Sequence, residues 1–65
     1  MRVFGLTKLG RRVISDKWED TEEFRVLDYL GRNKTATEGE LEVIGGEKFV
    51  LRRLKERGLI RELTT

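Results

Sequence analysis

The stretch "LIREL" at residues 59–63 is typical of a β-strand, and a strand constrains a small fold because it needs a partner. Without one, the amides and carbonyls of residues 60–64 would lack ladder hydrogen bonds. The other strand-like run is "RVFGL" at residues 2–6, at the opposite end of the sequence. We therefore expect these two segments to pair antiparallel, either within one chain or by exchange between two subunits.

The chain has 65 residues and neither Cys nor His, which restricts how it can be stabilised. A domain of this size buries little apolar surface and often needs a disulfide, a metal ion, oligomerisation or very regular helix packing. The composition excludes disulfides, thiolate zinc sites and a histidine base. We expect one domain (1–65) built on regular helix packing, alone or as a homodimer, with no cofactor and no metal.

Helix signals divide the sequence between the two strand-like ends. Thr7 is a candidate N-cap for a helix in "KLGRRVIS" at 8–15, although Gly10 weakens that assignment. "DTEE" at 20–23 predicts a helix capped by Asp20, which "GRN" at 31–33 would close. "TEGE" at 37–40 predicts a second capping box, with Thr37 as the cap.

Two shorter helices are expected in the second half of the chain. The first, 38–44, would bury Leu41, Ile44 and Val43 and end at Gly45 and Gly46. The second, 46–57, would bury one face and expose the other, with Gly58 at its C′ position. Its predicted buried face contains Glu47, Val50, Leu51 and Leu54, and its exposed face contains Lys48, Phe49, Arg52, Arg53 and Glu56.

Charge is distributed unevenly along the chain, although the formal net charge is only +2. Residues 1–17 contain five basic groups and one acid, net +4, and residues 48–65 contain six basic groups and two acids, also net +4. Residues 18–47 contain three basic groups and nine acids, net −6. If the ends of the chain meet, their basic side chains should form one positive surface away from the acidic middle.

The order helix, short helix, tight turn and basic helix, followed by "RGLI" and a strand, resembles a winged helix-turn-helix. "LRRLKERGLIREL" at 51–63 is similar to the third helix and first wing strand of MarR-like and archaeal winged-helix regulators, and "TATEGEL" at 35–41 to the segment entering their second helix. In those families the second wing strand usually leads into a helix through "LT-x-x-G-R". Here "LTKLGRR" stands at 6–12, as if the fold were permuted.

This resemblance implies a mostly helical α+β fold with a three- to four-helix core. The N- and C-terminal strands would form a two-stranded antiparallel sheet. It also implies double-stranded DNA as the partner, with helix 46–57 in the major groove and the basic termini on the phosphate backbone. The predicted DNA-binding residues are Lys48, Phe49, Arg52, Arg53, Arg11, Arg12, Lys8, Lys34, Thr35 and Thr37.

Several of these residues have structural alternatives. Phe49 would contact thymine methyls or sugars, or else pack against Trp18, the preceding helix or a dimer mate. Thr37 would face a phosphate, or act only as a helix cap. Arg11 and Arg12 would grip phosphates or simply solvate their helix. Trp18 would stack on a ligand or a base, or cover the core.

The remaining expectations concern class and location. No nucleophile–base pair or Gly-rich phosphate loop is present, so we expect no enzymatic activity. No apolar run is long enough to span a membrane and no signal peptide begins the chain, so we expect a cytoplasmic, nucleoid-associated transcription regulator without a small-molecule effector. The many charges and the absence of Gln suggest a thermophilic source, and the resemblance to archaeal winged-helix regulators implies an archaeal one. A protein-interaction module and an RNA-binding protein are the alternatives.

Overall fold

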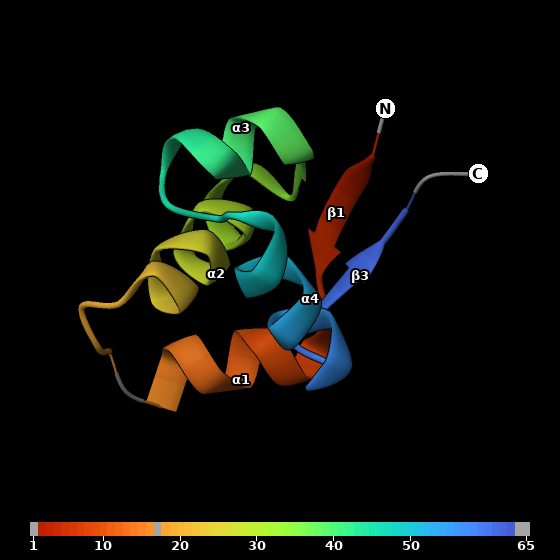
Figure 1. The fold of residues 1–65 in the computed structure, drawn as a ribbon. Helices are drawn as coiled ribbons and strands as arrows, with labels where there is room; N and C mark the ends of the chain where they lie inside the picture. Colours follow the sequence, from red (N-terminus) through yellow and green to blue (C-terminus); the bar gives the residue numbers. More distant parts are fainter. Residues whose placement is uncertain (1, 17, 64–65) are drawn as a thin grey trace.

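The computed structural model describes residues 2–16 and 18–63. Within them the chain is a small, mostly helical α+β unit of four helices and a three-stranded antiparallel sheet (Figure 1). The elements in chain order are β1 (Val3–Leu6), α1 (Lys8–Asp16), α2 (Glu22–Asn33), β2 (Thr35–Thr37), α3 (Glu38–Val43), α4 (Lys48–Glu56) and β3 (Ile60–Glu62).

The first and last strands lie side by side, as the sequence predicts. β1 pairs antiparallel with β3 within the same chain, with Phe4 opposite Glu62 and Leu6 opposite Ile60. A backbone hydrogen bond from Leu63 N to Val3 O, 2.7 Å, extends the pairing by one residue. The expected strand 60–64 is therefore confirmed for its described part, and Thr64 lies outside the described residues.

The sheet has a third strand that the sequence analysis missed. β2 pairs antiparallel with the other edge of β1, with Phe4 opposite Ala36, so the strand order is β2-β1-β3. The prediction of a two-stranded sheet was therefore wrong. β2 is only three residues long, and the chain enters it through Lys34 at φ 69°. A strand this short has too few residues to show alternation, and from the sequence "TAT" is indistinguishable from the entry to the next helix.

The core lies between the helices and one face of the sheet. Phe4, Leu30, Leu41 and Leu54 are completely buried, and the aliphatic face of α4 is buried as predicted. α3 differs from the expectation, because it ends at Val43 and leaves that side chain 86% exposed. Since α3 makes fewer than two turns, only Leu41 faces the core fully, while Ile44 is partly buried just after the helix.

The helix caps correct one prediction and confirm two. Thr21, not Asp20, caps α2, because the Thr21 hydroxyl accepts from Phe24 N over 3.3 Å, while Asp20 pairs with Arg25. Thr37 forms the predicted capping box with Glu40 at the start of α3. After α4, Gly58 adopts φ 77°, and Leu59 N donates to Leu54 O over 2.9 Å, which is the expected glycine-terminated helix end.

Gly10 weakens the helix prediction for α1 but explains how that helix packs. The residue is buried, and a Cβ atom at this position would overlap the Leu59 carbonyl oxygen and Leu6 Cδ1. Only glycine therefore allows α1 to lie against the end of α4 and the start of β3. The helical propensity lost at Gly10 is the cost of that close approach.

The turn before α4 makes that helix shorter than predicted, starting at residue 48 instead of 46. Gly46 N donates to Leu41 O over 2.7 Å, and a Cβ on Gly46 would meet Leu41 O and Val26 Cγ2, both at 2.8 Å. Glu47 then has extended backbone angles as the N-cap. The close contact with α3 and α2 prevents these two residues from joining the helix.

Candidate functional site

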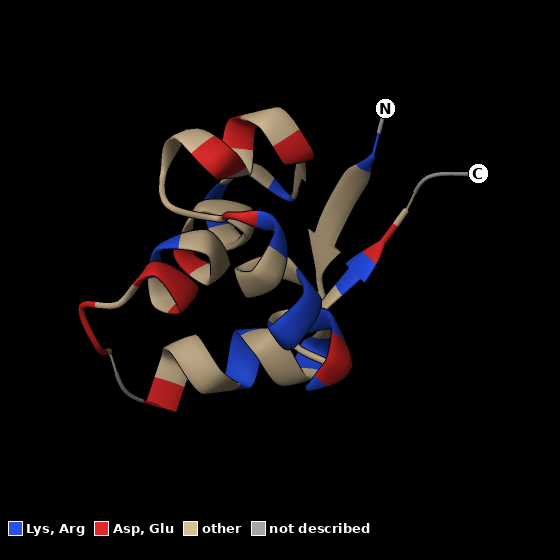
Figure 2. Cartoon of the chain, viewed as in Figure 1, with Lys and Arg blue, Asp and Glu red and all other residues tan. Residues whose placement is uncertain are grey.

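The exposed side of α4 presents the basic side chains that the sequence analysis assigned to DNA. Lys48, Arg52 and Arg53 are exposed, while Val50, Leu51 and Leu54 face the core. Basic residues colour α4, part of α1 and β3, whereas acidic residues gather on α3 and at the start of α2 (Figure 2). The separation of charge expected from the sequence is therefore present only in part, because Glu23 of α2 and Glu38 of α3 pair with basic residues of this surface.

The α4 cations fall into two groups according to those partners. Arg53 pairs with Glu23 over 3.3 Å, and the same carboxylate accepts from Arg57 over 3.0 Å. In contrast, Lys48 and Arg52 form no ion pair within the described residues. Lys48 and Arg52 are four residues apart and so lie on the same face of the helix. They are the α4 cations most available to an anionic partner.

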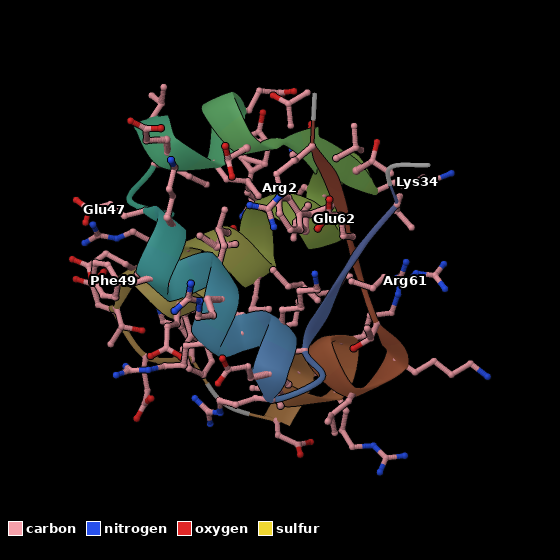
Figure 3. All side chains as sticks on the ribbon, turned by 45° about the vertical axis from the view of Figure 1, so that its right-hand side comes forward. Arg2, Lys34, Glu47, Phe49, Arg61 and Glu62 are labelled. Carbon is pink, nitrogen blue, oxygen red and sulfur yellow. The ribbon has the colours of Figure 1, made fainter. Side chains whose placement is uncertain are left out.

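Arg2 lies next to this free pair, at the start of the chain. Its guanidinium donates to Glu62 over 3.0 and 3.3 Å and to Glu38 over 3.0 Å, and it lies 5.2 Å from the centre of the Phe4 ring. Figure 3 shows Arg2 and Glu62 pointing toward one another beside α4. Arg61, which precedes Glu62 on β3, points to the other side of the sheet. Arg2 is absent from the predicted DNA-binding residues, but pairing of the termini predicts that it approaches the basic helix, and the structure places it beside Lys48 and Arg52.

Glu62 is the acidic centre of this group, because Lys55 of α4 also pairs with it over 3.1 Å. The hydrogen bonds from Arg2, and next those from Lys55, hold the pKa of the Glu62 carboxyl below its usual value. Correspondingly, the hydrogen bond to Glu62 raises the pKa of Arg2. One carboxylate thus joins β1, β3 and α4.

A hollow of about 220 Å³ opens between α4 and β1 at this position. Four cations surround it, and two apolar side chains complete its lining. The lining residues are Arg2, Lys48, Arg52, Lys55, Phe4 and Leu51. Such a space, with guanidinium and ammonium donors on several sides, is suited to a small oxyanion.

Phe49 projects outward at the start of α4 (Figure 3), with 61% of its surface exposed. It does not pack into the core of the chain. Trp18 instead meets Phe24 edge-to-face, with ring centroids 5.7 Å apart, so Trp18 partly covers the core as its structural alternative proposed. Trp18 itself remains 54% exposed. Phe49 is therefore available to a partner molecule.

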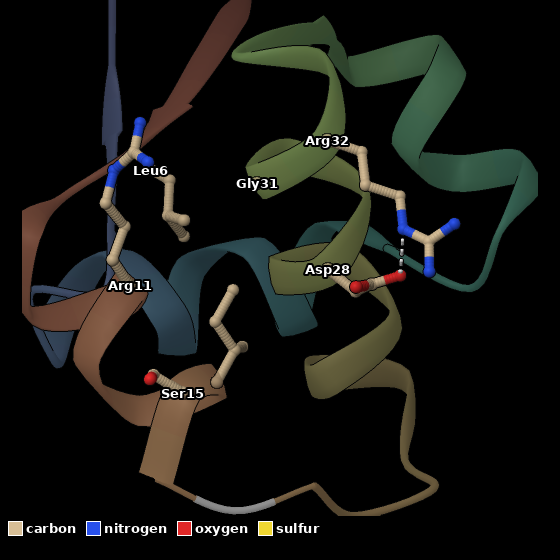
Figure 4. Close-up of a pocket in the computed structure, with 7 residues that line it drawn as sticks. Leu6, Arg11, Ser15, Asp28, Gly31 and Arg32 are labelled. Carbon is tan, nitrogen blue, oxygen red and sulfur yellow. Dashed lines mark ion pairs between the residues drawn. The ribbon is translucent and has the colours of Figure 1, made fainter.

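The α1 cations do not all join the α4 surface. Arg11 lines a hollow of about 320 Å³ between α1 and α2, together with Ser15, Asp28 and Arg32 (Figure 4). Arg12 follows Leu9 by three positions, and the Leu9 side chain lies near Gly58 at the end of α4, so Arg12 shares that side of α1. Lys8 is exposed on the first turn of α1. Arg11 and Arg12 therefore lie on different sides of α1.

The N-terminus of α3 is poorly suited to binding a phosphate. The Thr37 hydroxyl accepts from Glu40 N and donates to a Glu40 carboxylate oxygen, both over 3.2 Å. Glu38 and Glu40 add two negative charges to this first turn. The Tyr29 hydroxyl, followed by the Thr37 amide, holds the pKa of the Glu40 carboxyl below its usual value. Thr37 therefore acts as the helix cap.

Lys34 and Thr35 are exposed at the start of β2. In Figure 3 Lys34 lies at the upper right of the molecule, on the far side of β1 from α4. Of the ten predicted DNA-binding residues, the structure brings Lys48, Phe49, Arg52 and Arg53 together on α4. Lys34, Thr35 and Arg11 lie elsewhere.

Comparisons with protein-family models, curated proteins and solved structures found no match. In the part of the chain that the structure describes, no helix is long and apolar enough to cross a membrane.

Proposed function

We propose that this protein is a winged-helix DNA-binding protein that places α4 in the major groove of duplex DNA. The order α2, β2, α3, tight turn, α4 and β3 supports the winged-helix interpretation. β1, paired with β3, would take the position of the second wing strand. In helix-turn-helix proteins the corresponding last helix meets base edges and phosphates with its exposed face.

The observation that carries the proposal is the presence on α4 of two cations, Lys48 and Arg52, that no described carboxylate neutralises. Both side chains are exposed, have no ion pair among the described residues, and line the hollow beside Arg2. Most acidic residues of α3 and of the start of α2 colour parts of the ribbon other than α4 (Figure 2), although Glu38 pairs with Arg2 and Glu23 with Arg53. DNA can therefore approach α4 without meeting most of the chain's carboxylates.

The direct test is fluorescence anisotropy with a labelled mixed-sequence duplex at several salt concentrations. Binding should weaken steeply as salt rises, with a slope of about −0.9 per phosphate contact. Lys48→Ala with Arg52→Ala should weaken it strongly, whereas the control Arg25→Ala with Arg32→Ala removes the same charge from α2 and should have little effect. No affinity at low salt would refute DNA binding, and equal effects of the two double variants would refute α4 as the contact face.

A protein-interaction module on the same scaffold is the second candidate, and the exposed Phe49 ring favours it. Aromatic side chains, including Phe, are enriched in protein interfaces. Sedimentation analysis of the wild type and of Phe49→Ser separates this candidate from DNA binding when the partner is a second copy of the chain. A homodimer that dissociates in the variant would support it.

DNA binding implies a role as a transcription regulator or nucleoid-associated factor in the cytoplasm, and we include that role in the proposal. The chain would use neither a cofactor nor a small-molecule effector. This role depends on DNA binding, so a protein without DNA affinity would not have it.

A further inference from the structure

The hollow between α4 and β1 contains more positive charge than its acidic neighbours neutralise. Its lining includes four cations, Arg2, Lys48, Arg52 and Lys55. Two carboxylates reach them, with Glu38 and Glu62 on Arg2 and Glu62 also on Lys55. Four positive charges against two negative ones leave a net charge of +2. Lys48 and Arg52 account for this excess, since neither has an ion pair among the described residues.

The cations approach the hollow from two different elements that pairing of the termini brings together. Lys48, Arg52 and Lys55 follow one side of α4 at spacings of four and three residues. Arg2 extends from the residue before β1, with its guanidinium over the Phe4 ring at 5.2 Å. This stacking and the ion pairs hold the guanidinium in a defined position, so little ordering is needed before it meets a ligand.

We propose that this hollow holds one phosphate group of the DNA backbone, contacted by Lys48, Arg52 and Arg2. The inference rests on the proposed function and adds the location of one backbone contact. A phosphate offers several acceptor oxygens to donors from different directions, and the planar fork of arginine matches two of them. Phe4 and Leu51 form the apolar part of the lining.

The same geometry implies that Glu62 weakens phosphate binding. In the free protein Glu62 occupies Arg2 and Lys55, the two lining cations that are paired. A phosphate in the hollow would compete with this carboxylate for both donors and would be repelled by its charge. Arg2 would therefore exchange at least part of its contact with Glu62 for the phosphate. Removing the charge of Glu62 should free Lys55, leave Arg2 paired with Glu38 alone, and strengthen DNA binding.

The experiment compares the full chain with Glu62→Gln, Arg2→Ala and Arg61→Ala in the duplex anisotropy assay. Glu62→Gln should bind several-fold more tightly, and Arg2→Ala about tenfold more weakly with a salt slope reduced by about one. Arg61→Ala is the matched control, because Arg61 lies on the adjacent strand, has no ion pair among residues 2–16 and 18–63, and points to the other side of the sheet (Figure 3). It should change affinity less than Arg2→Ala.

Circular dichroism of each variant shows whether a loss of binding reflects a loss of folding. This control is needed because Arg2 forms ion pairs with Glu38 of α3 and Glu62 of β3. If Arg2→Ala unfolds, Glu62→Gln still decides the matter, because a merely structural role predicts weaker or unchanged binding for it. Inorganic phosphate is the second probe, and it should shift the amide NMR signals of residues 2, 48 and 52 in preference to that of residue 61.

The outcomes distinguish this inference from the proposed function. Duplex binding that is lost in the Lys48 and Arg52 double variant but unaltered in Glu62→Gln and Arg2→Ala would overturn the hollow as a phosphate site. It would leave DNA binding through α4 intact. Phosphate-induced shifts spread evenly over all exposed basic residues would likewise overturn the site. Absence of any duplex binding would overturn both proposals.

Discussion

The Thr7 hydroxyl donates to the Gly58 carbonyl oxygen over 2.6 Å, so the residue just before α1 is linked to the glycine that follows α4. The same hydroxyl also lies 3.0 Å from the Leu59 carbonyl oxygen and accepts from Gly10 N over 3.1 Å. The cap that the sequence predicts at Thr7 is therefore also a tertiary link. It holds the two basic segments of the chain in one unit.

Replacing Thr7 by Val should destabilise the fold by about 1–3 kcal/mol, because the isosteric side chain leaves the Gly10 amide and the Gly58 carbonyl without their hydroxyl partner. Thr7→Ser keeps the hydroxyl and should retain most of the stability. Urea denaturation followed by circular dichroism measures both. Equal stability of the Val and Ser variants would show that the hydrogen bonds of the Thr7 hydroxyl do not stabilise the fold.

Gly10→Ala should destabilise the protein by about 1–3 kcal/mol, although alanine is the better helix former, because the added methyl overlaps the Leu59 carbonyl oxygen. Gly39→Ala is the matched control within α3. A Cβ there meets only Thr37 Oγ1, at 4.0 Å, so that variant should be stabilised by up to about 1 kcal/mol. Thermal midpoints compare the two, and a stabilising Gly10→Ala would contradict the close approach of α1 to β3.

Acid should weaken the fold partly through Glu62. The pKa of its carboxyl is lowered in the folded chain, so its contribution to stability is present above the ordinary value near 4.5 and is lost as the pH falls through the lower folded value. Glu62→Gln should therefore be less stable than wild type at pH 7 and should match it in strong acid. Urea midpoints measured from pH 7 to pH 2 give this comparison. A gap between the two proteins that stays constant with pH would contradict the assignment.

Phe49→Ala should change the free energy of unfolding by no more than about 0.5 kcal/mol, because the ring is largely exposed. The same substitution should weaken duplex binding if Phe49 contacts the DNA. Denaturation and anisotropy together separate the two effects. A large loss of stability would mean that the ring is covered in solution, as it would be across a dimer interface.

Arg53→Ala should weaken DNA binding less than Arg52→Ala, although both arginines are exposed on α4. Arg53 pairs with Glu23 in the free protein and would have to leave that carboxylate to reach a phosphate, whereas Arg52 would not. Anisotropy titrations of the two single variants at the same salt concentration test this order. The reverse order would indicate that the DNA lies toward the α2 side of α4.

Local features of the fold were readable from residue types because they depend on neighbours in the chain. Thr37 with Glu40 satisfies helix amides within four residues, and Gly58 supplies a left-handed backbone angle that other residues rarely adopt. The aliphatic face of α4 followed from spacing alone. Pairing of β1 with β3 also followed, because a strand-like segment needs ladder partners and the sequence offered one at the other end.

The tertiary structure alone decided which charges are available and which neighbours share a face. β2 became a strand because the free edge of β1 was beside it, and a three-residue segment has no periodicity of its own. Arg53 and Arg52 are adjacent in sequence, yet only Arg53 meets Glu23, thirty positions away. Pairing of the termini predicts that Arg2 and Arg11 both approach α4, whereas packing places Arg2 beside α4 and Arg11 between α1 and α2. Side-chain charge is a property of the sequence, whereas ion pairing depends on distances that only packing sets.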